Sequence, residues 1–225
     1  MCGRYAFFAP ADAIATLFEI EDPPEIEFSY NVAPTDYVPA VRYQEGARRL
    51  SMLRWGLIPF WAKNKQIGVK MINARAETVS EKPAYKSAFK QRRCLLPASG
   101  FFEWQKTSQG KQPHFISLST GEAFAFAGIW ESWGKDEEKI ESVSIITTQP
   151  NPLVAQVHDR MPVIVPKDYF AKWLGEESAE SGDLKEYLVP YPENEMRFYP
   201  VGKAVGNPRN KTQECIAPLE SDSLF

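Results

Sequence analysis

From residue 38 onward the sequence is divided into short apolar segments, each three to eight residues long, separated by turn-forming residues. Segments of this length, rich in β-branched and aromatic residues, are typical of strands and too short for ordinary helices. The predicted strands cover residues 38–43, 50–55, 70–76, 94–96, 101–105, 114–118, 123–130, 143–147 and 163–165. This pattern constrains the fold most, because it predicts a strand-rich middle of the chain.

Helices are predicted on both sides of these strands and between them. Residues 12–20 place apolar side chains at helical spacing, with Asp12 as the N-cap, and Pro23 follows the predicted end. Asn151 is the expected cap of a helix over 152–157, because Pro152 suits a first helical position. Further helices are predicted over residues 83–91, 167–174 and 184–188. Together these elements indicate an α+β fold, with a curved, mostly antiparallel sheet or barrel-like core and short flanking helices.

The chain has 225 residues and contains neither internal repeats nor a low-complexity linker, so we expect one domain over residues 1–225. Its 44% hydrophobic and 24% charged residues match ordinary globular proteins and argue against disorder. We expect a core over 1–210, an acidic surface loop at 176–183 and a loose tail over 211–225.

No segment approaches the ~20 apolar residues of a membrane span, and the first thirty residues lack a signal-peptide pattern. We therefore expect a cytoplasmic protein without a membrane partner. Cys2, Cys94 and Cys215 are odd in number and widely spaced, which predicts reduced thiols, no disulfide and no metal site. No cofactor is expected either.

The net charge of −3 is unevenly distributed. Between Val41 and Cys94 there are thirteen Lys or Arg residues and three acidic ones, so this segment carries +10 and the rest of the chain −13. Such a basic segment in an acidic protein suggests an anionic ligand held on one face. A solvated basic surface without a ligand is the alternative.

Cys2 directly follows the initiator methionine, and its small side chain favours removal of Met1. The exposed residue then carries an α-amine, with a reference pKa of ~7.7–8.0, beside a thiol with a pKa of ~8.5. Such a 1,2-aminothiol condenses with an aldehyde to an imine, which the thiol closes to a five-membered thiazolidine. Next to it, Gly3 allows close approach of a ligand, and Arg4 supplies a charge suited to a phosphate.

Three further places combine polar chemistry with an informative context. In residues 72–77, strand alternation predicts Asn73, Arg75 and Glu77 on one face, which is either a site or a solvated strand surface. Glu103 lies among three aromatic residues, where burial raises a carboxyl pKa toward the range of general acid–base catalysis; a buried ion pair is the alternative. His158 begins a polar, proline-terminated segment and is either a site residue or a structural one.

Residues 54–61 combine a strand end with a loop that carries Trp55, Phe60 and Trp61. Exposed rings of this kind stack on unpaired bases, whereas buried ones belong to the core. The basic surroundings favour bases.

Seven motifs in this order resemble the SRAP family, the SOS-response-associated peptidase proteins, which include bacterial and human abasic-site shields. The resemblance covers about residues 1–210. The motifs are Met1-Cys2-Gly3-Arg4, Asn31-Val32-Ala33-Pro34, Arg54-Trp55-Gly56-Leu57-Ile58-Pro59, Ile72-Asn73-Ala74-Arg75-Ala76-Glu77, Gly100-Phe101-Phe102-Glu103-Trp104, His158-Asp159-Arg160-Met161-Pro162 and Ala204-Val205-Gly206-Asn207.

The resemblance implies that Cys2 forms a thiazolidine with the ring-opened abasic sugar, giving a covalent crosslink that shields the lesion in single-stranded DNA or at a junction with duplex. It also implies roles for the matching residues. Asn73 orients the Cys2 terminus, Glu103 accepts and donates protons, and His158 assists opening of the sugar. The implied DNA-binding residues are Arg4, Arg75 and Arg160 at phosphates, Trp55 and Trp61 as stacking groups, and Thr147 and Asn207 as polar supports.

Two other functions remain open on the sequence. Cys2, Glu103 and His158 also resemble the arrangement of a cysteine peptidase or N-terminal-nucleophile hydrolase, a class of activity that includes self-removal of Met1. The basic and aromatic segment alone is compatible with a noncovalent single-strand binder. We expect a monomer in each case.

Overall fold

Five strands close into a barrel, because the pairings return to the strand from which they began. In the computed structural model, which describes residues 2–21, 23–178 and 181–219, the ring runs β10-β4-β3-β6-β9 and back to β10. Its members are β3 (Tyr37–Gln44), β4 (Ala47–Trp55), β6 (Arg93–Ala98), β9 (Phe124–Trp133) and β10 (Ile140–Thr148). All neighbours in the ring are antiparallel except β4 and β10, which are parallel.

Strand β10 changes partners along its length, and this brings two short strands to its far end. Ser142 and Val143 pair with β4, whereas Ile145 to Thr147 pair in parallel with β5 (Asn73–Arg75). On the other side, Thr147 and Thr148 pair with β11 (Met161–Pro162). The end of β10 therefore brings the segment at residue 73 close to the segment at residue 161.

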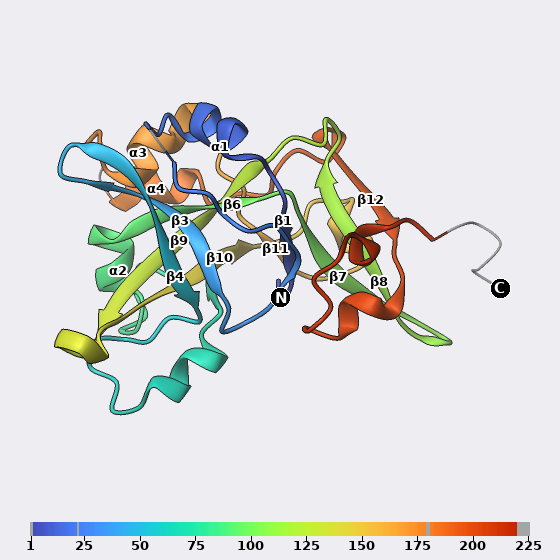
Figure 1. The fold of residues 1–225 in the computed structure, drawn as a ribbon, viewed down its shortest axis with the longest axis horizontal. Coiled ribbons are helices and arrows are strands. Elements are labelled where there is room, and N and C mark those ends of the chain that lie inside the picture. Colours follow the sequence, from blue (N-terminus) through green and yellow to red (C-terminus); the bar gives the residue numbers. More distant parts are fainter. Residues whose placement is uncertain (1, 22, 179–180, 220–225) are drawn as a thin grey trace.

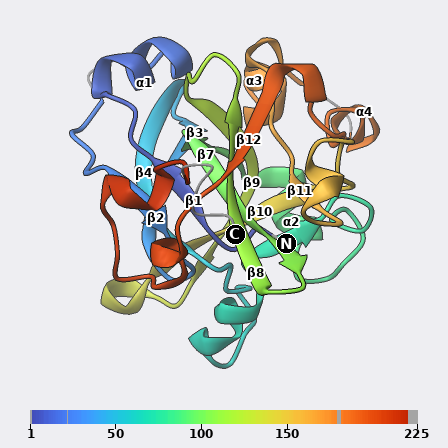
Figure 2. The same ribbon diagram turned by 90° about the vertical axis from the view of Figure 1, so that its right-hand side faces the viewer.

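A second sheet lies beside the barrel, with the strand order β12-β8-β7-β1-β2 (Figures 1 and 2). Its strands are β1 (Tyr5–Phe7), β2 (Ser29–Val32), β7 (Gly100–Thr107), β8 (Gly110–Leu118) and β12 (Met196–Pro200). The chain passes from β6 of the barrel to β7 through Ser99 alone. At this crossing a side chain on Gly100 would come within 2.2 Å of the Phe115 ring, so the two strands need a glycine here.

Aromatic rings fill the space between the barrel and β1. Tyr5 meets Trp55 and Phe126 edge to face, with ring centroids 5.4 and 5.7 Å apart. Trp55 is fully buried, and its indole nitrogen donates to the carbonyl oxygen of Ile72 over 3.0 Å. The expectation that Trp55 stacks on DNA is therefore wrong: strand β4 directs this side chain into the core.

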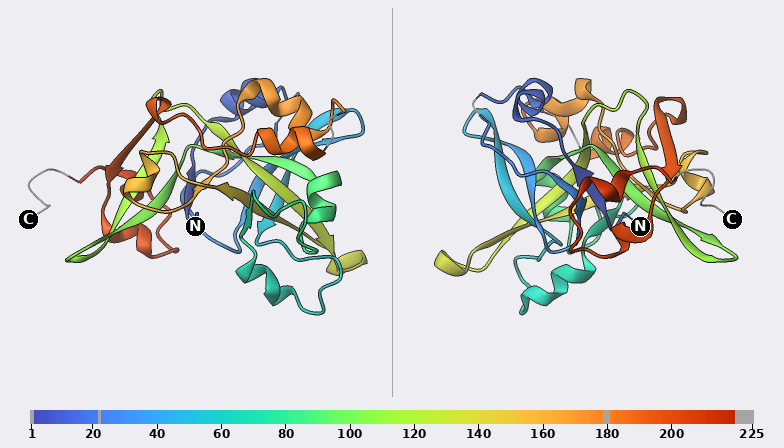
Figure 3. Two further views of the ribbon diagram at one scale, coloured as in Figure 1. Left: turned by 180° about the vertical axis from the view of Figure 1, so that it is seen from behind. Right: turned by 45° about the vertical axis from the view of Figure 1, so that its right-hand side comes forward.

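Short helices cover one end of the barrel (Figures 1 and 3). They are α1 (Ala11–Phe18), α2 (Lys86–Gln91), α3 (Phe170–Leu174) and α4 (Ser181–Glu186). Helices α1 and α3 pack together through the stacked rings of Phe18 and Phe170, 5.3 Å apart. The remaining short turns are 3-10 helices, including η1 (Lys65–Lys70), η3 (Val154–Gln156), η6 (Lys203–Gly206) and η7 (Gln213–Ile216).

The structure corrects two details of the predicted helices. Pro10, not Asp12, is the N-cap of α1, and Glu19 ends that helix with a φ of 53°, four residues before Pro23. Asn151 accepts the N–H of Val154 over 2.8 Å, but it stands two residues before Leu153, which is the N-cap. The element that follows is the three-residue 3-10 helix η3, not an α-helix over 152–157.

The predicted α+β class with a barrel-like core is confirmed, and each predicted strand except the last overlaps an observed one. The last predicted strand, at residues 163–165, is displaced: the observed strand β11 lies just before it in the chain. Within 163–165, Ile164 forms an isolated bridge with Phe126. Besides β11, three observed strands were not predicted: β1, β2 and β12. They are three to five residues long, and β2 and β12 carry polar or proline residues that weaken the strand pattern.

Two surface predictions change in the structure. In the segment expected to be an acidic loop, Glu176 pairs with Arg48 over 2.6 Å, and helix α4 begins at Ser181. The expected tail is not loose at its start, because Lys211 contacts Asn31 and Asp36 and Cys215 is buried. Residues 220–225 lie outside the described residues.

The cysteines Cys2, Cys94 and Cys215 are all buried and carry free thiols. Among the residues that the structure describes, no helix has the length and apolar character to cross a membrane.

Candidate active site

Cys2 lies just before β1, and its backbone is held by a residue of β5, the short strand that pairs with the end of β10. The side-chain nitrogen of Asn73 donates to the carbonyl oxygen of Cys2 over 2.8 Å. Asn73 begins β5, where alternation of side chains buries Ala74 and Ala76 and exposes Arg75 and Glu77, as predicted. The parallel pairing of β5 with β10 therefore positions Asn73 against the N-terminal residue.

The other amide atom of Asn73 is available for a further contact. Its Oδ1 is buried and accepts no hydrogen bond from any residue that the structure describes. A buried acceptor left without a donor costs about 1–3 kcal/mol, so it is suited to a group that arrives later.

Glu103 comes from β7 and is almost completely buried. This burial raises the pKa of the Glu103 carboxyl to about 7. Burial likewise raises the pKa of the Cys2 thiol well above its usual range, and the nearby Glu103 carboxylate raises it further. Near neutral pH the thiol is therefore protonated, while the carboxyl is ready to exchange a proton.

His158 reaches the same place from the loop between η3 and β11. Its Nε2 lies 3.8 Å from Oε2 of Glu103, and its Nδ1 accepts the backbone N–H of Arg160 over 3.0 Å. The N–H of Arg160 favours the tautomer with the ring proton on Nε2, toward Glu103, whereas the Asp159 carboxylate beside Nδ1 favours a proton on Nδ1. Burial lowers the pKa of His158 and favours the neutral ring. The Asp159 carboxylate, 2.9 Å from Nδ1, acts in the opposite direction and raises this pKa, but the Asp159 side chain is 87% exposed.

Arg160 is held by Thr147 of β10 and by Glu77 in the turn after β5. Its guanidinium donates to both carboxylate oxygens of Glu77, over 2.6 and 3.0 Å, and to the carbonyl oxygen of Thr147 over 2.5 Å. Thr147 is fully buried. It therefore supports Arg160 and has no surface of its own for DNA, which corrects its predicted place among DNA-binding residues.

The other predicted phosphate contacts differ in exposure. Arg4 is half-buried and donates to the carbonyl oxygen of Gly3 over 3.1 Å; burial lowers the pKa of Arg4, and Asp36 opposes this. Arg75 is exposed at the end of β5. Asn207 lies on a loop after β12, where its Oδ1 accepts the N–H of Arg209. Its hydrogen bonds thus belong to a second cluster, apart from Glu103 and His158.

Trp61 is 51% exposed on a loop that projects from the barrel (Figures 1 and 3). Its neighbour Phe60 is 62% exposed, and η1 on the same loop carries exposed lysines. The base of this loop is closed by Gly56 and Gly68, since a side chain on either would come within 2.5 Å of the other's carbonyl oxygen. Phe60 was not selected from the sequence as a separate site residue, although it stands beside Trp61.

Several cations of the basic segment, residues 41–94, form ion pairs within the folded protein. Arg42 pairs with Glu141, Arg48 with Glu176 and Arg92 with Glu131. The predicted single basic face is therefore only partly correct. The exposed cations that remain are spread over two places: Lys63, Lys65, Lys70 and Arg75 on the projecting loop and β5, and Lys82, Lys86 and Lys90 before and in α2.

Within the described residues, no group of three or more His, Cys, Asp or Glu side chains has the arrangement of a metal site.

Comparison with known proteins indicates the same protein family as the sequence motifs. The family model of the SOS response associated peptidase (SRAP) matches residues 1–208. The chain belongs to the SRAP family. The abasic site processing protein YoaM of Bacillus subtilis is 40% identical over 221 residues, which cover 96% of this chain and 97% of that protein.

More distant relatives share the family and the fold. The abasic site processing protein HMCES of Xenopus tropicalis is 31% identical, over 85% of this chain and 66% of that protein. A crystal structure of a protein from Bacteroides thetaiotaomicron superposes with a TM-score of 0.85 at 25% identity, covering 97% of this chain and all of that one. The SRAP fold thus extends over nearly the whole chain.

Proposed function

We propose that this SRAP protein senses and shields abasic sites in single-stranded DNA, through a thiazolidine formed between Cys2, freed of Met1, and the ring-opened sugar. The names of its relatives support abasic-site processing. One observation carries the covalent chemistry: Asn73 holds the backbone of Cys2, whose thiol is electrostatically coupled to Glu103. An N-terminal aminothiol held beside a buried proton carrier is suited to capture an aldehyde. In a cell we expect this activity in the cytoplasm.

The reaction proceeds in two bond-forming steps. The Cys2 amine adds to C1′ of the open sugar, a C–N bond forms, and loss of water leaves an imine. The thiol then adds across the C=N bond, so that sulfur bonds to C1′ and its proton ends on nitrogen. An imine left open is prone to β-elimination and strand cleavage, and ring closure prevents this.

Glu103 and His158 supply the proton transfers for these steps. With a pKa of about 7, Glu103 takes a proton from the attacking amine and returns it to the leaving oxygen. Because the pKa of the buried Cys2 thiol is raised, its proton must leave as the S–C bond forms. His158, with its Nε2 toward Glu103, assists opening of the sugar ring.

The surrounding residues are arranged to hold the strand. The unpaired Oδ1 of Asn73 is suited to accept from the new Cys2 amine or from a sugar hydroxyl. Arg4 and Arg75 bind phosphates, and Trp61 stacks on a base beside the lesion. Arg160, fixed by Glu77, contributes charge at the edge of the site.

The test uses an oligonucleotide with one abasic site, protein whose N-terminus is checked by intact mass, and a denaturing gel. We expect a heat-stable shifted band with the wild type and none with Cys2→Ala. The matched control is Cys94→Ala, which changes a buried cysteine in the barrel and keeps the band. A band that survives Cys2→Ala would sink the covalent mechanism.

A cysteine peptidase is the second candidate, favoured by the family's description and by Cys2, Glu103 and His158 meeting in one place. It predicts turnover of a peptide substrate that Cys2→Ala abolishes. Cleavage limited to loss of Met1 argues against it.

A further inference from the structure

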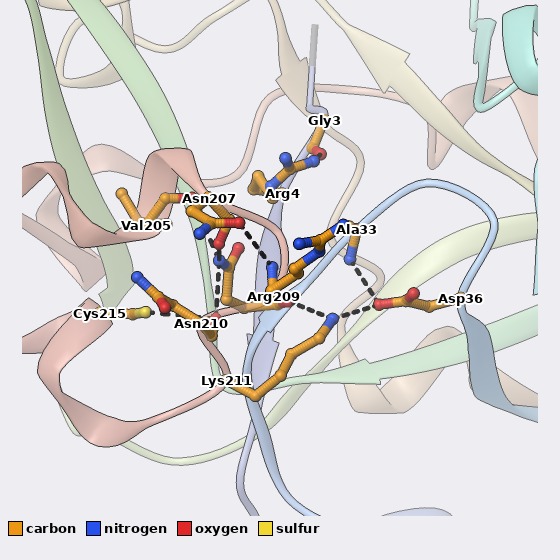
Figure 4. Close-up of polar contacts among 11 residues, drawn as sticks. Gly3, Arg4, Ala33, Asp36, Val205, Asn207, Arg209, Asn210, Lys211 and Cys215 are labelled. Carbon is orange, nitrogen blue, oxygen red and sulfur yellow. Dashed lines mark hydrogen bonds and ion pairs between the residues drawn. The ribbon is translucent and has the colours of Figure 1, made fainter.

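A buried asparagine fixes the loop that carries Asn207. Asn31 of β2 is fully buried, and its side-chain amide donates to the carbonyl oxygens of Val205, Asn207 and Asn210 over 3.1, 3.0 and 2.9 Å. Figure 4 shows Val205, Asn207 and Asn210 of this loop side by side. All three carbonyl groups belong to the loop, so this one buried side chain shares its two N–H groups among them and holds the loop backbone from inside.

The side chain of Asn210 adds a second brace, since it donates to the carbonyl oxygen of Ala204 over 2.9 Å. The end of the loop is tied to β2 as well, because Lys211 donates to the carbonyl oxygen of Asn31 over 2.7 Å and pairs with Asp36. A loop braced in this way presents its exposed groups without a large loss of entropy on binding.

Arg209 is such a group. Its backbone N–H donates to Oδ1 of Asn207 over 3.1 Å, while its side chain is exposed. Among the described residues no carboxylate lies within ion-pair distance of Arg209, in contrast to Lys211, Arg48 and Arg160. The fold therefore fixes the backbone of this arginine and leaves its guanidinium for a ligand.

The loop lies beside the N-terminal segment of the active site. Pairing of Tyr5 with Val32 places Arg4 opposite Ala33, whose N–H donates to Asp36 over 3.0 Å. Asp36 also acts electrostatically on Arg4. Figure 4 draws Arg4, Arg209 and Lys211 in one region with Ala33 and Asp36, and Asp36 pairs with Lys211.

We propose that residues 203–211 form a second phosphate site, in which Arg209 binds a phosphodiester of the single strand that leads away from the abasic nucleotide. The site rests on the proposed function, because Arg4 and the Cys2 terminus mark where the lesion lies. An exposed guanidinium can bind a phosphate through two parallel hydrogen bonds. Asn31 is then a positioning residue, and Asn207 supports Arg209 rather than the reacting sugar.

The first test measures noncovalent binding of an undamaged single strand between about 50 and 200 mM salt. One lost phosphate contact lowers the steepness of log K against log salt by about 0.7. We expect this loss for Arg209→Ala and not for Arg209→Lys, which keeps the charge. The control is Arg49→Ala, since Arg49 is 56% exposed on the β3–β4 hairpin and pairs with Glu45.

The second test measures the rate of crosslinking to strands whose abasic site is central, at the 5′ end or at the 3′ end. Arg209→Ala should slow crosslinking to the strand with the central site. It should also slow crosslinking to one of the two strands with an end site, namely the strand whose remaining nucleotides run past Arg209. An unchanged salt slope, or equal slowing at both ends, overturns the site. Wild-type protein that binds with the expected slope but never crosslinks contradicts the proposed function and leaves this site standing.

Discussion

The side-chain nitrogen of Asn73 lies 2.8 Å from the carbonyl oxygen of Cys2, and this hydrogen bond joins residues 71 positions apart in the sequence. Because Asn73 is itself fixed by the pairing of β5 with β10, the barrel holds the peptide unit of Cys2, the residue that we propose reacts. Removing Met1 leaves this carbonyl group in place, so the bond serves the processed protein as well.

Asn73→Ala should therefore slow crosslinking by about 10- to 100-fold, because displacement of a reacting group by an ångström has effects of this size. Asn73→Asp keeps the shape and loses the donor, and it should be similarly slow. Single-turnover crosslinking rates measure the effect, and thermal unfolding checks folding, since one lost hydrogen bond costs only about 1 kcal/mol. Rates equal to wild type in both variants contradict this role.

Glu77 and Arg160 predict a loss of stability in acid. The hydrogen bonds from Arg160 lower the pKa of Glu77, so the folded state binds fewer protons than the unfolded state in this range. This contribution to stability is full above the ordinary pKa of 4.5 and is lost as pH falls through the lowered value. Since Glu77 is 45% exposed, water screens the pair and the effect stays below about 1 kcal/mol.

Glu77→Gln should accordingly be less stable than wild type at pH 7, and the two should converge on acidification. Denaturant unfolding at a series of pH values measures this. Glu81→Gln is a matched control, as Glu81 is exposed in the same segment. A constant difference at every pH contradicts the pairing.

Glu103 predicts the opposite dependence on pH. Burial raises its pKa from 4.5 to about 7, so the folded state binds more protons than the unfolded state between these values. Stability contributed by the neutral carboxyl is therefore lost as pH rises through this window. Glu103→Gln keeps a neutral side chain, and relative to wild type it should gain roughly 1–3 kcal/mol between pH ~4.5 and ~7.

The same variant should crosslink slowly at every pH, because an amide cannot carry the proton. Unfolding free energies and crosslinking rates measured on one preparation separate the two effects. A variant whose stability runs parallel to that of wild type contradicts the raised pKa.

Much of the fold was predictable from the sequence, for reasons that are local, whereas the roles of Asn73, Glu103 and His158 came from the resemblance to the SRAP family and stay predictions. Alternation in residues 72–77 sets which side chains of β5 point outward, and pairing with β10 does not change it. The helix at α1 follows from the spacing of Ile14 and Phe18, both fully buried. Such patterns depend only on which side of a single helix or strand faces the core.

Contacts between distant segments were not predictable in the same way. Asn31 reaches residues 205–210 across more than 170 positions, and nothing near it in the sequence indicates that partner. The ion pair of Arg160 with Glu77 and the burial of Thr147 likewise depend on which strands meet at β10. Strand order in the barrel sets these contacts, and local patterns do not specify strand order.

Trp55 and Trp61 show this limit and lead to a direct test. The two tryptophans lie six residues apart in the same aromatic and basic segment. Trp55 is nevertheless buried at the end of β4, whereas Trp61 is 51% exposed. Trp55→Ala should lower the free energy of unfolding by about 3–5 kcal/mol, as for other large core residues. Trp61→Ala should change it by less than about 0.5 kcal/mol.

Binding of single strands should show the reverse order. Loss of one stacked ring costs about 1–3 kcal/mol, so Trp61→Ala should weaken binding by roughly 5- to 150-fold. Trp55→Ala, measured below its melting temperature, should bind with nearly unchanged affinity. Fluorescence anisotropy with an undamaged strand, with unfolding curves of the same samples, measures both effects. If Trp61→Ala binds as tightly as wild type, the projecting loop is not a stacking surface, and contact with DNA is confined to the arginines around Cys2.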